Sequence, residues 1–188
     1  NITISAPQLS TQIASGPFCE NDSIIALNAV ITGGTWTGLG INNGNFDPST
    51  AGVGSHLISY TSPGSCSETT VTSIIVSPIP EIDISADTTA GCPPLYVTFL
   101  DSELAAGNTY FWNFGNGNSS SQYGATSHLF NSSGCFDISL EVTSTNGCIG
   151  YQSISDLVCI FEKPNAAFTY YPISTTLSTP NITFTNET

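Results

Sequence analysis

The chain has 188 residues, with 14 Asp and Glu against one basic side chain, Lys163, so its formal net charge is −13. A single basic residue cannot neutralise a phosphate backbone, which excludes nucleic acid and anionic membrane surfaces as partners. Hydrophobic residues make up 39% of the sequence, which is enough for packed cores, and no apolar run approaches the roughly 20 residues that a membrane-spanning helix needs.

The residue types favour strands. Thr, Ser, Ile, Val, Gly and Asn are abundant, whereas the helix formers Lys, Arg, Glu, Met and Gln are scarce, as expected of an all-β protein with tight turns. Six cysteines in short domains predict disulfides and therefore an oxidising, extracellular location. No metal site is expected, because the chain has no Cys-x-x-Cys pair and neither His56 nor His128 stands at ligand spacing from a cysteine.

Residues 1–15 contain a short alternating run that ends at a proline, which predicts the closing strand of a preceding unit and a joint. We expect the chain to begin within an array, with its secretion signal outside this sequence. Residues 16–78 are predicted to form a first domain of short strands bounded by turn residues; these strands are 23–30, a segment around Trp36, 55–61 and 70–76. Two prolines in residues 77–80 predict a stiff, extended joint after it.

A second domain is predicted over residues 79–163. Residues 95–101 and 136–144 alternate between apolar and polar side chains, the pattern of half-buried strands. Asn146-Gly147 directly after the second of these strands predicts a two-residue hairpin turn. The next strand should therefore return antiparallel and reach residues 158–161.

Residues 164–188 are predicted to begin a third, incomplete repeat. Its segment NITFTN is similar to LYVTFLD at the equivalent place of the second domain. Such internal similarity predicts a repeat protein.

The second domain resembles a PKD domain, an immunoglobulin-like β-sandwich. The resemblance rests on motifs that follow one another through the whole domain, namely GCPPLYVTF (91–99), YFWNFGNGNSSS (110–121), SHLF (127–130), SGCFDISLEVTSTNGC (133–148) and VCIFEKPNAAF (158–168). The first domain is similar to the immunoglobulin-like repeats that accompany PKD domains, through FCEND (18–22), GGTWTGLG (33–40), GNFDPSTAGVGSHLISYT (44–61) and CSETTVTSIIV (66–76). The fold class implied is all-β, with tandem immunoglobulin-like sandwiches.

The resemblance also implies a setting. Such arrays occur in large surface proteins of Bacteroidota that the type IX secretion system exports, including gliding-motility-associated adhesins and filament proteins. The function expected is that of a structural or adhesive repeat segment of an extracellular fibre or cell-surface adhesin, with neighbouring repeats, other copies in a fibre and surface glycans as partners. The alternative is a non-catalytic spacer or carbohydrate-binding accessory module of a secreted hydrolase.

The PKD signature loop departs from the family at two positions. The family carries Asp residues where this chain has Asn113 and Asn116, which weakens the calcium site that the resemblance would imply. We therefore expect no cofactor, with calcium as the one alternative that stays open.

The cysteine pairing follows from the two-domain division. Cys19 and Cys66 are the first domain's only cysteines and flank its strands, so they are predicted to pair. In the second domain three connectivities are open. Cys135 with Cys159 fits the predicted hairpin if a bulge absorbs the register offset, which leaves Cys92 with Cys148, a pairing that the family resemblance supports.

Candidate ligand and catalytic residues are few. Trp36 and Trp112 are candidates for stacking against a carbohydrate, but core packing is favoured for both, and His56 and His128 are expected to be structural. No Gly-x-Ser-x-Gly elbow occurs and the acidic residues are scattered, so no catalytic residues are assigned and the chain is not expected to be an enzyme.

Two residues are candidates for O-glycosylation. By resemblance to Bacteroidota proteins, Asp followed by Ser or Thr and then an apolar residue or Thr marks the acceptor. Ser23 and Thr88 satisfy this pattern.

Overall fold

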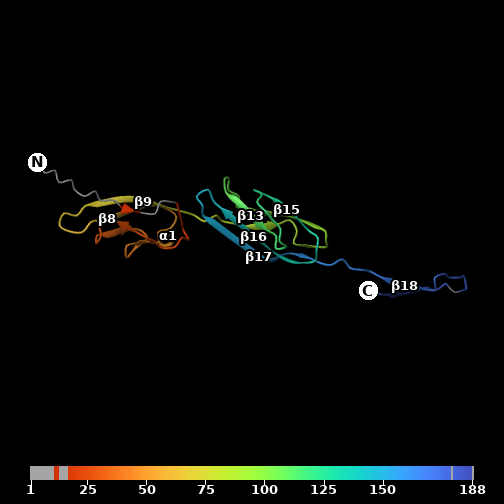
Figure 1. Cartoon of the computed structure of the whole chain (residues 1–188). Helices are drawn as coiled ribbons and strands as arrows, with labels where there is room; N and C mark the ends of the chain where they lie inside the picture. The colour runs from red at the N-terminus through yellow and green to blue at the C-terminus, as the bar shows by residue number, and fades with distance from the viewer. Residues whose placement is uncertain (1–10, 13–16, 179, 188) are drawn as a thin grey trace.

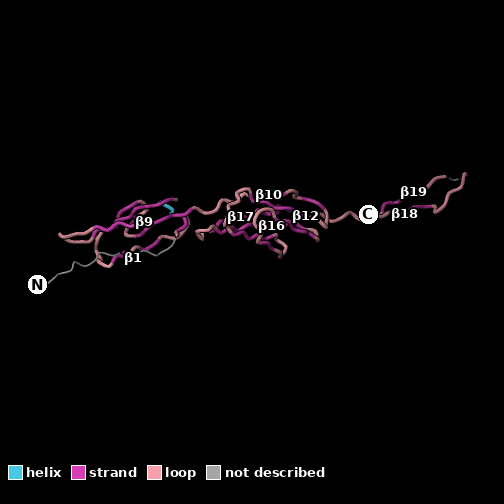
Figure 2. Tube along the Cα trace, turned by 90° about the horizontal axis from the view of Figure 1, so that it is seen from above, coloured by secondary structure: helices cyan, strands magenta, loops and turns pink. Residues whose placement is uncertain are grey.

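A computed structural model gives the structure of residues 11–12, 17–178 and 180–187. It is an all-β architecture of tandem immunoglobulin-like sandwiches, as the sequence predicts. Two sandwiches lie end to end, and a separate hairpin follows at the C-terminal side (Figure 1). Seen from above, strands make up nearly all of the regular structure (Figure 2). Among the described residues, no helix is long and apolar enough to cross a membrane.

The first sandwich consists of a four-stranded sheet in the order β2-β9-β8-β5 and a three-stranded sheet in the order β3-β7-β6, with a separate β1-β4 pair. Its elements are β1 (Thr11–Gln12), β2 (Phe18–Cys19), β3 (Ile25–Ala26), β4 (Asn28–Ala29), β5 (Thr35–Gly38), β6 (Ile41–Asn42), β7 (Asn45–Phe46), α1 (Pro48–Ala51), β8 (Gly54–Thr61) and β9 (Thr69–Ser77).

The core of the first sandwich forms because β8 and β9 alternate between buried and exposed side chains. Its fully or nearly fully buried members are Leu27, Phe46, Ala51, Ile58, Ile74 and Val76. The one-turn helix α1 is capped at its N-terminus by Asp47, whose carboxylate accepts hydrogen bonds from the backbone N–H groups of Ser49 and Thr50. Bonds from the side chains of Ser49 and Thr50 lower the pKa of Asp47 from its ordinary value.

The second sandwich pairs a three-stranded sheet, β10-β12-β15, with a five-stranded sheet, β11-β17-β16-β13-β14. Its strands are β10 (Ile84–Ala86), β11 (Ala90–Gly91), β12 (Leu95–Asp101), β13 (Thr109–Asn113), β14 (Ser119–Ser120), β15 (Thr126–Phe130), β16 (Gly134–Thr143) and β17 (Ile149–Ile160). The alternation predicted for residues 95–101 and 136–144 is confirmed by the burial of β12 and β16.

The core of the second sandwich is aromatic and separate from that of the first. Its buried members are Ile84, Val97, Phe99, Tyr110, Trp112, Phe114, Phe130, Ile138, Leu140, Val142, Val158 and Ile160. The two clusters share no residue, so each sandwich has its own core.

The turn between β16 and β17 differs from the prediction. β17 does return antiparallel to β16, but the loop has three residues because Ser144 and Cys148 still pair through a backbone hydrogen bond of 2.8 Å. Gly147 has φ of 85° and its N–H donates to the Ser144 carbonyl. This geometry is typical of a three-residue hairpin loop, in which only the last residue needs a positive φ.

At the C-terminal side, β18 (Phe168–Tyr171) and β19 (Thr183–Asn186) form an antiparallel hairpin. Its residues 168–171 and 183–186 are all exposed. The predicted closing strand of a preceding unit, residues 1–15, lies outside the described residues except for Thr11 and Gln12.

Candidate functional site: the joint between the two sandwiches

A disulfide crosses the joint. Cys19 in β2 is bonded to Cys148, with Cα atoms 5.5 Å apart and a sequence separation of 129. Both side chains are buried. Cys19 belongs to the first sandwich because β2 pairs with the end of β9, and Cys148 immediately precedes β17 of the second, so the bond joins two separately packed bodies.

The connecting segment, residues 78–81, is held by contacts with both sandwiches. The N–H of Ile79 donates to Oε1 of Glu20 in the first sandwich, at 3.1 Å. On the other side the carbonyl oxygen of Pro80 lies so close to Gly150 that a Cβ at this position would overlap it. Gly150 is a buried residue of β17, and the missing side chain lets the connection pack directly on that strand.

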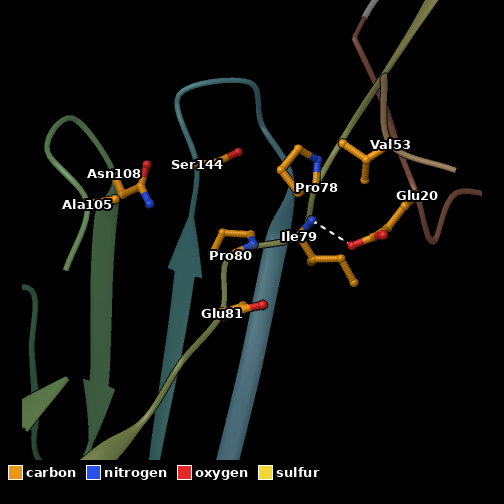
Figure 3. A pocket seen from close by; sticks show the side chains of 9 residues that line it. All are labelled: Glu20, Val53, Pro78, Ile79, Pro80, Glu81, Ala105, Asn108 and Ser144. Atoms are coloured by element: carbon orange, nitrogen blue, oxygen red, sulfur yellow. Dashed lines mark hydrogen bonds between the residues drawn. The ribbon is translucent and has the colours of Figure 1, made fainter. Parts of the chain in front are cut away.

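A cavity of about 690 Å³ opens at this joint, lined by residues of both sandwiches and of the connection. Figure 3 shows Glu20 and Val53 on one side, Ala105, Asn108 and Ser144 on the other, and residues 78–81 between them. One carboxylate oxygen of Glu20 is engaged by the connection. The cavity therefore lies between the two sandwiches, beside the connection that joins them.

The predicted pairings Cys19–Cys66 and Cys92–Cys148 are wrong, because the two cysteines of each pair lie near opposite ends of a long strand. Cys19 lies beside the last residue of β9, whereas Cys66 precedes the first. A nine-residue strand spans about 30 Å, and disulfide-bonded Cα atoms lie within about 7 Å. The same argument separates Cys92 from Cys148, which lie beyond opposite ends of the twelve-residue β17. Cys66 and Cys92 are both exposed and unpaired.

The pairing of Cys135 with Cys159 is present, with Cα atoms 4.1 Å apart. The bulge on which it depends lies between Phe136 and Ile138 in the register of β16 with β17. Asp156 occupies it with φ of 52°, and its N–H donates to the Asp137 carboxylate at 2.8 Å.

The two tryptophans differ. Trp112 is fully buried in the core, which rules out the stacking role considered for it. Trp36 is half-buried, lies with its ring 4.8 Å from that of Tyr60 and lines a small cavity of about 160 Å³. Ligand stacking by Trp36 remains a prediction.

Both histidines make structural contacts. His128 stacks on Phe114 with ring centroids 4.2 Å apart, and its Nε2 lies 2.9 Å from the amide nitrogen of Asn116. Burial lowers the pKa of His128 from the ordinary 6.5. His56 is hydrogen-bonded through Nε2 to the Gly52 carbonyl at 2.7 Å.

The glycosylation candidates differ in access. Ser23 is exposed, and Thr88 is half-buried with its hydroxyl donating to the Ala90 carbonyl. Modification of either remains a prediction. Within the described part of the chain, no group of three or more His, Cys, Asp or Glu side chains could hold a metal ion.

One surface was missed by sequence reasoning. Phe111, Glu141 and Tyr151 lie side by side across β13, β16 and β17, on the outer face of the five-stranded sheet. Phe111 is 49% and Tyr151 66% exposed. The alternation of β13 and β17 already placed both aromatic side chains opposite the core, which was the signal available.

Comparison with known proteins gives a family match that covers the second sandwich. Residues 75–159 match the family model described as PKD domain. Domains of this type are typically non-catalytic, and the match together with the two disulfides fits a secreted or surface protein with a structural or adhesive role. A search of curated proteins found no match.

Among solved structures, the chain is similar to the PKD1 domain of Epp from Vibrio anguillarum, at 25% identity and a TM-score of 0.36 over 44% of this chain and 95% of that one. It is also similar to the amphioxus IgVJ-C2 molecule, at 12% identity and a TM-score of 0.34 over 55% and 59% of the two chains. Protocadherin Gamma B7 extracellular cadherin domains 1–4 match at 9% identity and a TM-score of 0.28 over 89% and 55%.

Proposed function

We propose that this chain is a repeat segment of a long extracellular fibre or cell-surface adhesin, in which each sandwich is a structural link. The observation that carries the proposal is the Cys19–Cys148 bond across the joint. Tension applied to the two ends of the chain passes through this covalent bond. The residues between its two cysteines, which include most of both cores, lie outside the path of the force.

The geometry of β17 supports the same role. Cys148 directly precedes β17, which extends from the joint to the far end of the second sandwich (Figure 1). A strand is already close to full extension. Tension that enters at Cys148 is therefore carried along a nearly taut backbone.

The β18–β19 hairpin supports a continuing array. A two-stranded hairpin is at best marginally stable alone, and Phe168, Tyr171 and Phe184 of this hairpin are 64%, 78% and 65% exposed. These side chains would be buried by a further sandwich.

The proposal extends to the origin of the full-length protein, and there it rests on the sequence resemblance. We propose a gliding-motility-associated surface protein of Bacteroidota that is exported by type IX secretion. Neighbouring repeats, other copies in a fibre and surface glycans are the proposed partners, and no cofactor is required.

A second candidate function is glycan binding, as in an accessory module of a secreted hydrolase. It is favoured by the exposed Phe111 and Tyr151 on either side of Glu141, because flat aromatic faces beside a polar group suit stacking on sugars. A glycan array probed with the chain and with its Phe111→Ala/Tyr151→Ala variant tests this candidate. Glycan binding that is lost in the variant supports this candidate, and the absence of binding by the unmodified 188-residue chain contradicts it.

The fibre role is tested by gold-labelled antibodies against this chain on intact secreting cells. We expect label along surface filaments. Label confined to a secreted protein that also carries a hydrolase domain would contradict the fibre role and favour the accessory module.

A further inference from the structure

Two of the six cysteines are left unpaired by the disulfides of the chain. Cys66 and Cys92 are both exposed, and each lies close to an end of a last strand, β9 or β17. Each also has a bonded counterpart in the other sandwich.

Cys66 lies at the same turn of its sandwich as Cys148. Cys148 closes the three-residue loop that leads into β17, and Cys66 lies in the loop that leads into β9, two residues before its closing residue Glu68. The two loops close alike: the N–H of Ser62 donates to the Glu68 carbonyl at 2.9 Å, and that of Ser144 to the Cys148 carbonyl at 2.8 Å. In each loop the serine hydroxyl also accepts the returning N–H, at 2.9 Å from Glu68 and 3.1 Å from Cys148. The first loop is two residues longer, and Cys66 lies within it.

Cys92 corresponds to Cys19. Cys19 lies in the short strand β2, which pairs in parallel with the end of β9, opposite Ser77. The equivalent strand of the second sandwich is β11, which pairs in parallel with the end of β17, with Gly91 opposite Ile160. Cys92 is the next residue along the chain.

The two unpaired cysteines, Cys66 and Cys92, lie at the outer ends of the unit formed by the two sandwiches. β9 runs from the Cys66 loop toward the joint, and β17 runs from the joint toward the Cys92 loop. The bonded members, Cys19 and Cys148, meet at the joint itself. The end-to-end arrangement of the sandwiches is visible in Figure 1.

We infer that Cys66 and Cys92 are two halves of the same bridge, completed by the adjacent sandwiches of the same chain. Cys66 bonds a cysteine beside the end of the last strand of the preceding sandwich. Cys92 bonds a cysteine in the last hairpin loop of the following one. This inference rests on the proposed function, because it requires a sandwich on each side, and it makes the Cys19–Cys148 bridge one member of a series.

The reaction is a thiol–disulfide exchange. The thiolate of one cysteine attacks a donor disulfide, such as that of an oxidised thiol-oxidoreductase, and expels one donor thiolate. The second cysteine, as its thiolate, attacks the mixed disulfide and expels the other. Two protons leave the cysteines, and the two electrons reduce the donor disulfide to a dithiol.

The test is thiol counting and peptide mapping on the parent protein secreted by its source, blocked with an alkylating reagent at harvest. We expect Cys66 and Cys92 to escape alkylation and to appear in cross-linked peptides with the two flanking sandwiches. In the 188-residue chain alone, both should be alkylated, while Cys19, Cys135, Cys148 and Cys159 are not.

Single variants of the parent protein locate the partners. Cys92→Ser should expose one new thiol, in the last hairpin loop of the following sandwich, and Cys66→Ser should expose one new thiol in the preceding sandwich. Each sandwich has its own core, so we expect both variants to fold, with only the adjoining joint weakened.

The contrary outcomes are distinguishable. If flanking sandwiches are present but Cys66 and Cys92 are alkylated, the inference is overturned and the fibre proposal stands. Cross-links between separate copies overturn the assignment to the same chain. A parent protein without flanking sandwiches overturns both the fibre proposal and the inference.

Discussion

Cys19 and Cys148 are bonded to each other although they belong to sandwiches with separate cores. The bond thus stabilises an arrangement of domains, in addition to restricting the unfolded chain. Cys135–Cys159, by contrast, joins neighbouring strands within one sheet.

Removing the bridge should lower stability strongly. A cross-link that closes 129 residues is worth up to about 5 kcal/mol by chain entropy, so Cys19→Ser/Cys148→Ser should lose about 3 to 5 kcal/mol of unfolding free energy in urea. The matched control is Cys66→Ser/Cys92→Ser in the same chain. Its two cysteines are exposed and unpaired, so it should change by no more than about 0.5 kcal/mol. If Cys19→Ser/Cys148→Ser lost no more than about 0.5 kcal/mol, as expected of the control, the bridge would not stabilise the fold.

Gly150→Ala should disturb the joint. The new Cβ would overlap the backbone carbonyl oxygen of Pro80, and backbone cannot move aside as a side-chain end can. Overpacking of this kind costs about 1 to 3 kcal/mol, and small-angle scattering should detect a changed distribution of interdomain distances. Ile149→Ala is the control, since Ile149 is the adjacent residue and is 51% exposed. An unchanged scattering curve for Gly150→Ala would mean that the connection does not rest on β17.

Trp112→Ala should cost about 3 to 5 kcal/mol, because it empties a large volume in a fully packed core. Trp112→Phe should cost less. Nε1 of Trp112 has no hydrogen-bond partner among the residues that the structure describes, and removing an unsatisfied buried donor offsets part of the lost packing. Urea denaturation of both variants checks the order, and a more damaging Trp112→Phe would contradict it.

His128 should make stability depend on pH. An amide nitrogen only donates, so the contact with Asn116 requires an unprotonated Nε2, and burial lowers the pKa of the ring from 6.5. The unfolded chain then takes up its proton at a higher pH than the folded one. The contribution of His128 is therefore complete above pH 6.5 and is lost as the pH falls below that value.

The quantity to measure is the difference between the parent chain and His128→Gln, in urea midpoints at pH 7.5 and 5.5. The variant cannot titrate in this range, and the subtraction removes the effect of the acidic residues. The parent chain should lose more stability than the variant at the lower pH. A parallel response of the two chains would contradict this account.

The sequence predicted the strands of the second sandwich well because their periodicity is local. Phe136, Ile138, Leu140 and Val142 repeat at every second position, and the structure buries that face of β16. The Cys135–Cys159 pair could be predicted for the same reason, because both residues lie in one hairpin and their pairing depends only on its register.

The other pairings failed because they depend on how whole sandwiches are arranged. Within the first sandwich, Cys19 and Cys66 lie near opposite ends of β9 and are too far apart to bond. Within the second, Cys92 and Cys148 lie beyond opposite ends of β17. The bond from Cys19 to Cys148 arises from end-to-end stacking, which no local pattern encodes. The hairpin at Asn146-Gly147 gained a residue because Ser144 and Cys148 continue the ladder beyond Thr143.

The central claim, that the bridge carries tension across the joint, is tested most directly by single-molecule pulling from the two ends of the chain under non-reducing conditions. The parent chain cannot release the 129 residues closed by Cys19–Cys148, whereas Cys19→Ser/Cys148→Ser is held back only by the 24 residues of Cys135–Cys159. The variant should therefore extend further by 129 minus 24, or 105, residues, which is about 370 Å at about 3.5 Å per residue. Equal extension of the two chains would show that the load does not pass through this bond and would contradict the account.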